Sequence, residues 1–297
     1  MNNILVSICM LTYNHEKYIQ NAIEGVLMQE TNFEYELIIA NDSSSDGTNV
    51  IILEIIENNK QGYRIKYSNN EQNKGTMTNF LFALEQCSGK YIALCEGDDF
   101  WTDPYKLQKQ VDFLDKNSDY SFCGHEVDIY NEYIKNKIGK YASGKSTFGL
   151  KDTILGPPMH TSSLVFRNNF KLPASISRLP AGDDALECIL ASKGLAFSFP
   201  ETMSVYRLSE VGTWSTLSQI EKNHIILIVQ LWILRNFPLL IIKQTRRIND
   251  LIQLIKKEKK SLITSLILKD KFTIFFAIVF YKSYTYTSYI KNKLFPR

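Results

Sequence analysis

The stretch Tyr91-Ile92-Ala93-Leu94-Cys95-Glu96-Gly97-Asp98-Asp99-Phe100-Trp101 decides the fold prediction. Its apolar first half is typical of a strand covered on both faces of a parallel sheet, and the three carboxylates of Glu96, Asp98 and Asp99 follow at once. Open α/β sheets bind ligands at the carboxyl ends of their strands. Because neighbouring carboxylates repel one another, the pattern predicts a divalent cation shared with a phosphorylated ligand. The alternative is a solvated turn that caps a helix with Pro104 in its first turn.

The sequence around this stretch alternates between strand and helix patterns. Apolar runs predict strands over 4–11, 37–40, 91–95 and 120–129, and apolar spacing predicts helices over 16–30, 46–60, 75–87 and 104–117. Alternation with short connections predicts an α/β fold, a doubly wound, mostly parallel sheet flanked by helices. The polar loops 12–15, 41–47 and 96–99 would then share one rim.

The second half of the chain is less regular. Residues 131–156 are polar and contain Gly and Lys, which predicts a loop, whereas 161–166 reads as a strand and 182–192 as a helix. From about residue 220 the chain alternates apolar patches with Lys and Arg clusters. We therefore predict one α/β domain over 1–218 and a basic, amphipathic helical region over 219–297.

Composition agrees with a globular protein and separates the two regions by charge. The chain has 297 residues, 44% of them apolar and 12% aromatic. Residues 220–297 contain 15 Lys or Arg against 4 Asp or Glu, although the whole chain has a net charge of only +3. The five cysteines have no CxxC spacing, which favours buried thiols in a reducing compartment. The first residues lack the features of a signal peptide, so we expect the catalytic part in the cytoplasm.

The loop 41–47 resembles the beginning of an EF-hand calcium loop. Leu53 occupies the twelfth position, where calcium binding needs a carboxylate, and a strand rather than a helix precedes the loop. Calcium binding is therefore excluded. Asp42 is instead positioned to accept a hydrogen bond from a nucleobase or ribose, and Asp46 to cap the next helix.

Four motifs, in this order, resemble those of family 2 glycosyltransferases with the GT-A fold, in particular enzymes of bacterial surface polysaccharides. They are residues 6–14, ending in Leu11-Thr12-Tyr13-Asn14, the segment 37–48, Asn73-Lys74-Gly75 with Asn79, and Glu96-Gly97-Asp98-Asp99-Phe100-Trp101. The resemblance covers roughly residues 1–215 and implies that the predicted sheet is a GT-A, Rossmann-like fold.

The resemblance also implies roles for individual residues. Asp42 would bind the base, usually uracil, and Asp98 would lie near the ribose or diphosphate. Asp99 would hold Mg²⁺ or Mn²⁺, with Asp98 and with Glu96, which stands where the family more commonly has an aspartate. The remaining residues implied in nucleotide binding are Thr12, Tyr13, Asn14 and Lys74.

Sugar transfer to a hydroxyl also needs a base. Gly182-Asp183-Asp184 opens a predicted helix, and the resemblance points to Asp184 as the base with Asp183 as its neighbour or an acceptor contact. The alternative is that both aspartates only cap the helix and complement its dipole.

Two further segments match the same subgroup. His160, in Met159-His160-Thr161-Ser162-Ser163, would contact the donor or acceptor sugar, although a single histidine beside a strand can also be structural. Arg207, with the aromatic residues Tyr206 and Trp214, would cover the diphosphate. Leu208 and Ser209 stand where a histidine often follows, which argues against metal ligation by this segment.

Taken together, the resemblance implies an inverting transferase that moves a sugar from a nucleotide-diphosphate donor, a UDP-sugar, to a growing, lipid-linked cell-surface polysaccharide. The metal would neutralise the departing nucleoside diphosphate, and no nucleic acid partner is expected. One alternative is a catalytically inactive sugar-nucleotide-binding or scaffold protein. Another is a nucleotidyltransferase, which the lack of a Gly-rich basic loop near residue 12 disfavours.

The C-terminal region is predicted to lie on a membrane. The apolar runs 225–242 and 272–281 are interrupted or short, and neither suits a hydrocarbon core of about 30 Å. Lys and Arg interleaved with Leu and Ile favour helices on an anionic surface, so we expect a peripheral position on the inner face of the cell membrane. A packing or oligomerisation module, or a span through 225–242, are the alternatives.

Overall fold

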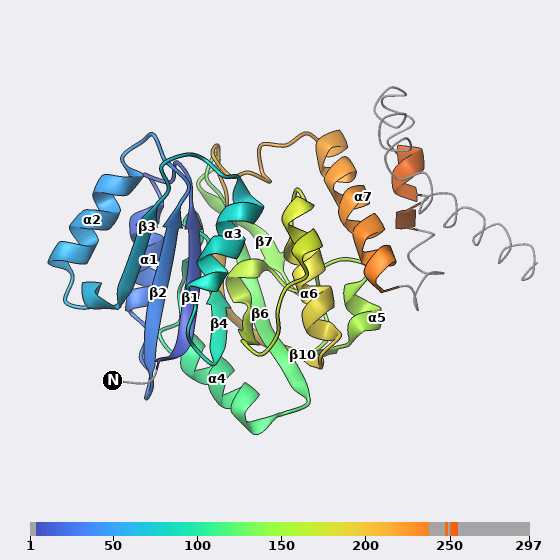
Figure 1. Cartoon of the computed structure of the whole chain (residues 1–297), viewed down its shortest axis with the longest axis horizontal. Helices are drawn as coiled ribbons and strands as arrows, with labels where there is room; N and C mark the ends of the chain where they lie inside the picture. Colours follow the sequence, from blue (N-terminus) through green and yellow to red (C-terminus); the bar gives the residue numbers. More distant parts are fainter. Residues whose placement is uncertain (1–3, 238–246, 249, 255–297) are drawn as a thin grey trace, which may run out of the picture.

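The computed structural model describes residues 4–237, 247–248 and 250–254 (Figure 1). Its described strands form one mixed sheet with the order β3-β2-β1-β4-β9-β6-β10-β5, and β7 pairs with β6 and β8 with β10. The strands are β1 (Ile4–Thr12), β2 (Glu34–Asn41), β3 (Ile65–Asn69), β4 (Tyr91–Leu94), β5 (Phe100–Trp101), β6 (Tyr120–Asn131), β7 (Asn136–Tyr141), β8 (Thr147–Phe148), β9 (Val165–Arg167) and β10 (Leu195–Leu208).

The first four sheet positions are parallel, which aligns the carboxyl ends of their strands. β1 pairs with β2 and β4, and β2 pairs with β3, all in parallel. The Asp42 N–H donates to the Thr12 carbonyl at 2.9 Å, and the Gly97 N–H donates to the Leu11 carbonyl at 2.8 Å. The three polar loops predicted to share a rim therefore touch one another, and the predicted α/β class is confirmed.

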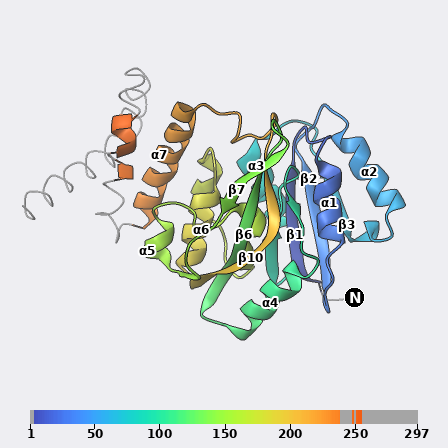
Figure 2. The same ribbon diagram turned by 180° about the vertical axis from the view of Figure 1, so that it is seen from behind.

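Helices cover both faces of these strands. The described helices are α1 (Ile19–Leu27), α2 (Thr48–Asn58), α3 (Thr76–Glu85), α4 (Lys106–Lys116), α5 (Leu150–Thr153), α6 (Asp183–Ala191) and α7 (Gln219–Asn236), with short 3-10 turns at η1 (Gly62–Arg64), η2 (Thr161–Ser163) and η3 (Ala174–Arg178). Alternate side chains of β1 enter two cores: Val6, Ile8 and Met10 pack with α1 and α4, whereas Cys9 packs on the side of α3 and α6. Figure 1 shows α3 and α6 in front of the sheet, and Figure 2 shows α1 on the opposite face.

The second half of the sheet mixes directions, and it corrects one prediction. β9 runs antiparallel to β4 and β6, whereas β10 runs parallel to β6. The segment 131–156, predicted as a loop, contains β7, β8 and α5. β7 reads Asn-Lys-Ile-Gly-Lys-Tyr and is mostly exposed, so pairing with β6 rather than burial of an apolar face determines it.

The predicted strand 161–166 is also wrong in its first half. Thr161–Ser163 is a 3-10 turn, and β9 starts only at Val165. The Ser163 hydroxyl donates to the His160 carbonyl at 2.7 Å, and the Ser162 N–H donates to His160 Nδ1 at 3.3 Å. These local bonds satisfy the polar groups within a turn and thereby compete with sheet pairing.

Helix α7 begins where the second region was predicted to begin. Ser218 caps it, with its hydroxyl accepting from the Glu221 N–H, and Val229 and Ile233 pack into a core shared with α6 and η3. No helix in the described part of the chain is long and apolar enough to cross a membrane. Most of the predicted basic region, including 238–242 and 272–281, lies outside the described residues.

Candidate active site

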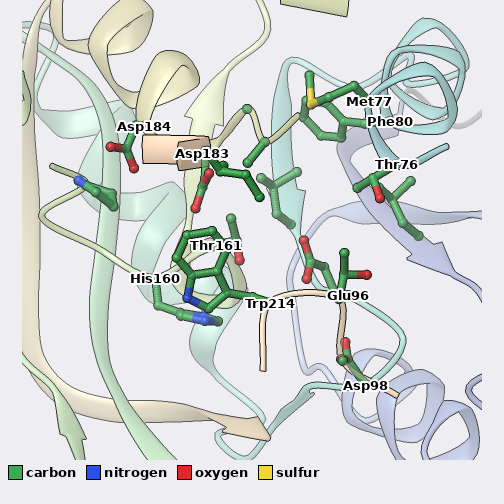
Figure 3. A pocket seen from close by; sticks show the side chains of 18 of the residues that line it. Thr76, Met77, Phe80, Glu96, Asp98, His160, Thr161, Asp183, Asp184 and Trp214 are labelled. Atoms are coloured by element: carbon green, nitrogen blue, oxygen red, sulfur yellow. The ribbon is translucent and has the colours of Figure 1, made fainter. Parts of the chain in front are cut away.

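A cavity of about 450 Å³ opens at the carboxyl ends of β1, β2 and β4. In Figure 3, Glu96 and Asp98 lie on one side of it and Asp183 and Asp184 on the other, with His160 and Trp214 between them. The residues singled out in the sequence as site residues that line it are Thr12, Tyr13, Asp42, Glu96, Asp98, His160, Asp183, Asp184, Tyr206, Arg207 and Trp214. Residues far apart in the chain therefore converge on one cavity.

Asp42 holds the loop after β3 against the cavity. One carboxylate oxygen accepts from the Lys74 N–H at 2.8 Å and the Asn70 amide at 3.0 Å, and the other accepts from the Gly75 N–H at 2.9 Å. The side chain is only 4% exposed. Since a carboxylate offers about four acceptor positions, one remains for a ligand donor such as an imide N–H.

Asn14 and Lys74 do not line the cavity. Asn14 has a left-handed φ of 55°, and its Oδ1 accepts from the Ser45 N–H at 2.9 Å. The Lys74 ammonium donates to Asn70 Oδ1 at 2.9 Å and lies over the Phe82 ring. In this state both side chains support the loops that carry Tyr13 and Asp42, and their predicted contact with the nucleotide stays a prediction.

The loop 96–99, here called the acidic loop, contains carboxyl groups that destabilise one another when charged. Burial, followed by repulsion from Asp98, raises the pKa of Glu96 to about 8. Burial, followed by repulsion from Asp98 and Glu96, raises the pKa of Asp99 well above its usual value. Asp99 is 1% exposed, and its Oδ2 is a buried atom with no hydrogen-bond partner among the described residues. A cation would relieve this repulsion.

The residues present fit a divalent cation by their chemistry, although the side chains are not gathered as a complete ligand set. Among residues 4–237 and the described part of 247–254, no three His, Cys, Asp or Glu side chains form a metal-binding group. Mg²⁺ typically takes one or two carboxylates and completes its shell with water and substrate phosphates. Glu96 and Asp98 line the cavity and could supply such ligands; Asp99 lies behind them, and its metal role stays a prediction.

Arg207 braces the acidic loop from behind. Its backbone N–H donates to Asp99 Oδ1 at 3.0 Å, and its guanidinium donates to the Asp98 carbonyl at 3.2 Å. The same guanidinium pairs with Glu132 at 3.2 Å and lies over the Phe100 ring. Arg207 is only 7% exposed and lines one edge of the cavity. Its positive charge offsets the negative charge of the carboxylates.

His160 lies beside the buried aspartate. Its Nδ1 is 3.8 Å from Asp99 Oδ2 and 2.9 Å from the Ser162 hydroxyl, and its ring packs on Tyr206 with centroids 4.3 Å apart. Burial lowers the pKa of His160 to about 4. The imidazole is therefore neutral near pH 7, so it can exchange hydrogen bonds with a ligand without adding charge.

Asp183 and Asp184 form the first turn of α6. Gly182 is the N-cap residue, and backbone N–H groups of the first turn partly offset the desolvation that raises the pKa of Asp183. Asp183 thus complements the helix terminus. Burial and the charge of Asp183 raise the pKa of Asp184 to about 7, in the range suited to a general base.

Sequence reasoning missed several residues around this acidic pair. Glu187 is 0% exposed and lies one turn further along α6, where burial and the charges of Asp184 and Asp183 raise the pKa of its carboxyl well above the usual value. Tyr141 and Arg247 line the same wall. The spacing from Asp184 to Glu187 along a helix was a usable signal, whereas Tyr141 and Arg247 reach the site only through tertiary packing.

Comparison with known proteins shows which family the chain resembles. Residues 7–170 match the family model described as Glycosyl transferase family 2. An uncharacterized protein of Mycobacterium tuberculosis is 36% identical over 214 residues, which are 70% of this chain and 60% of the relative. The chain therefore spans less than two thirds of that relative.

Two further proteins have named activities or ligands. WfgD of Escherichia coli, named UDP-Glc:alpha-D-GlcNAc-diphosphoundecaprenol beta-1,3-glucosyltransferase, is 36% identical over 143 residues, 48% of this chain and 53% of its own length. The crystal structure of S. aureus TarS 1-349 in complex with UDP-GlcNAc superposes with a TM-score of 0.60 over 92% of this chain and 79% of that one, at 16% identity. The latter likeness shows the fold.

Proposed function

The chain belongs to glycosyltransferase family 2, and from this membership we propose that it transfers a sugar from a UDP-linked donor to a lipid-linked acceptor of a cell-surface polysaccharide. One observation carries the proposal: two acidic centres, Glu96 with Asp98 and Asp183 with Asp184, face each other across a single cavity. Sugar transfer needs one centre for the leaving diphosphate and another for the attacking hydroxyl.

The donor would occupy the side of the cavity nearest the parallel strands. Asp42 retains acceptor capacity for the base, Thr12 has a buried hydroxyl with no hydrogen-bond partner among the described residues, and Tyr13 is 45% exposed beside it. Such groups suit a nucleoside at the carboxyl ends of strands. The name of the relative WfgD supports a UDP-sugar as donor.

A divalent cation, Mg²⁺ or Mn²⁺, would be held by Glu96 and Asp98, with Asp99 behind them, and would neutralise charge on the departing diphosphate. Arg207 holds the backbone of this loop in place. His160 stays neutral and offers a hydrogen bond to a sugar hydroxyl or phosphate oxygen. Each of these residues lowers the cost of separating UDP from the sugar.

Asp184 would remove the proton from the acceptor hydroxyl as its oxygen attacks the anomeric carbon. Attack from the face opposite the departing UDP forms the new glycosidic bond as the old bond breaks, which inverts the anomeric configuration. The wall on this side also contains the apolar residues Ile225, Ile226 and Val229 of α7. Such a wall suits an acceptor attached to a lipid, and the basic C-terminal region would keep the protein at the membrane surface.

The proposal is tested by donor screening followed by product analysis. UDP-sugars with Mn²⁺ should raise the melting temperature more than GDP- or CMP-sugars, because only binding to the folded state stabilises it. The selected donor, incubated with an undecaprenyl-diphosphate saccharide, should give UDP and a product whose new linkage has the inverted configuration by NMR. Binding of a UDP-sugar without any transfer would instead support the inactive binding protein.

A further inference from the structure

A short segment beyond α7 returns to the candidate active site. Residues 247–248 and 250–254 are helical, and Ile248, Leu251 and Ile252 are 0%, 7% and 5% exposed. Burial of these side chains docks the segment on the rest of the protein. Its first described residue, Arg247, lines the same cavity as Asp183 and Asp184.

The guanidinium of Arg247 lies against the main chain at Gly156. A methyl group built on Gly156 would be 3.0 Å from Nη1 and 3.3 Å from Nη2, so a hydrogen at this position leaves room for the cation. Tyr141 and Cys188 are its other close titratable neighbours besides Asp184. The arginine is thus enclosed between the loop before η2 and the wall formed by α6.

Asp184 is surrounded mainly by groups that oppose its negative charge. The titratable and charged groups that face it are Asp183, Glu187 and Cys188 of α6, Tyr141 of β7, and Arg247. The uncharged side chain of Gln230, from α7, also favours the charged form of Asp184. Arg247 is the one cation in this set of described groups.

No ion pair within 4.0 Å joins Arg247 to Asp184 among the described residues. A charge at somewhat longer range still favours ionisation in a partly desolvated wall.

We propose that Arg247 is a positioning residue for sugar transfer, which acts through Asp184 by keeping that carboxylate charged. The inference rests on the proposed role of Asp184 as the base. It implies that the region after α7 completes the active site in addition to any role at a membrane. Loss of this segment would remove the charge that balances Asp183 and Glu187 around the base.

The test compares Arg247→Gln with Arg235→Gln, the same change on the exposed last turn of α7. In full-length protein labelled with ¹³C at aspartate carboxyls, the Asp184 signal is assigned by its loss in Asp184→Asn. Arg247→Gln should raise the titration midpoint by about one pH unit, a tenfold change in proton affinity, because one neighbouring cation is lost. Arg235→Gln should leave the midpoint unchanged, and Arg247→Lys should restore most of it.

The pH dependence of turnover is a second, independent measurement. Arg247→Gln should be about tenfold slower than wild type below pH 7 and approach wild-type turnover above pH 9, where the carboxylate is ionised in both. If Arg247→Gln does not fold, Arg247→Met, which retains apolar packing, repeats both measurements.

Two results would overturn the inference: an unchanged Asp184 midpoint, or an equal loss of turnover at every pH. A failure of the proposed function can be distinguished from a failure of this inference, because the NMR titration needs no substrate. A shifted midpoint in a protein that transfers sugar from no UDP-sugar would count against the function and leave the electrostatic effect of Arg247 established.

Discussion

The side chains of the acidic loop determine what the donor half of the site can do. Asp98 lines the cavity, and Asp99 is buried behind it, with an Oδ2 that has no hydrogen-bond partner within the described part of the chain. Asp98→Asn and Asp99→Asn should each lower Mn²⁺-dependent UDP release on the order of 10²-fold or more, because each removes a charge that would stabilise the metal–diphosphate unit.

Asp112→Asn, a change of the same kind on the exposed face of α4, is the control for this pair and should keep wild-type rates. UDP release is measured at saturating donor, with folding checked by thermal melting. Undiminished release by Asp99→Asn with added Mn²⁺ would remove Asp99 from the ligand set and leave Glu96 and Asp98.

Glu96 makes the stability of the metal-free protein depend on pH. Its folded-state pKa is raised to about 8, so its contribution to stability is fully present below the unfolded pKa near 4.5 and is lost as pH rises through 8. Glu96→Gln, which cannot ionise, should reduce the fall in melting temperature between pH 5 and pH 9 on the order of 5 °C.

The melting temperatures are measured by thermal unfolding in EDTA, with Glu85→Gln on the exposed surface of α3 as the matched control. Glu85→Gln should follow the wild-type curve. A Glu96→Gln curve parallel to wild type would mean that Glu96 is not the group whose charging destabilises the folded protein.

At the scale of elements, the packing of α1 on β5 connects the core to the acidic loop. A methyl group built on Gly25 of α1 would lie 2.8 Å from the Trp101 carbonyl oxygen and 2.9 Å from its backbone nitrogen. Gly25→Ala should therefore push β5 away and destabilise the protein by about 1–3 kcal/mol. Because β5 directly follows Asp99, Mn²⁺-dependent turnover should fall as well.

Gly139→Ala is the control for this change, because no atom of the described residues lies within 4 Å of the added methyl group. Urea unfolding followed by circular dichroism should show no loss of stability for Gly139→Ala. Equal stability of Gly25→Ala and wild type would show that α1 and β5 can separate without cost.

Burial and strand pairing explain which elements could be predicted from the sequence. β1, β2 and β4 are buried on both faces, so their apolar runs identify them, and the loops that follow them could be assigned to one rim. β7 has few apolar residues and depends on its pairing with β6, so the sequence pattern predicted a loop. The 3-10 turn at Thr161–Ser163 depends on hydroxyl bonds that leave no periodic signal.

The position of a candidate residue could be predicted where a motif ends a strand or opens a helix, as for Asp98 and Asp184, which both line the cavity. The contacts around these residues were not predictable, because they join distant segments. Arg207 supports the acidic loop through both its backbone N–H and its guanidinium, and Arg247 lies near Asp184 from beyond α7. Local sequence contains no record of either contact.

At the scale of the whole molecule, charge separates the two regions. Residues 220–297 hold 15 of the 34 Lys and Arg residues and only 4 of the 31 acidic ones. Deleting 255–297 should weaken sedimentation with anionic vesicles in a salt-sensitive way, since exposed charges are screened within about 10 Å at 0.1 M salt. UDP binding should persist, because α7 and Arg247 remain.

The comparison uses phosphatidylglycerol vesicles and neutral phosphatidylcholine vesicles at low and high salt, with calorimetry for UDP. Equal sedimentation of the truncated and full-length proteins with the anionic vesicles would assign membrane binding to residues before 255. A loss of UDP binding would show that the C-terminal region also supports the donor site.

In the proposed reaction, two acidic centres around one cavity divide sugar transfer between them. The most direct measurement is transfer from the selected UDP-sugar to an undecaprenyl-diphosphate saccharide by wild type, Asp98→Asn and Asp184→Asn, with Mn²⁺ or EDTA, alongside UDP affinity. We expect transfer only by wild type with Mn²⁺, and near-normal UDP affinity in Asp184→Asn with Mn²⁺. Transfer that survives EDTA, or that Asp184→Asn catalyses at the wild-type rate, would rule out this division of roles.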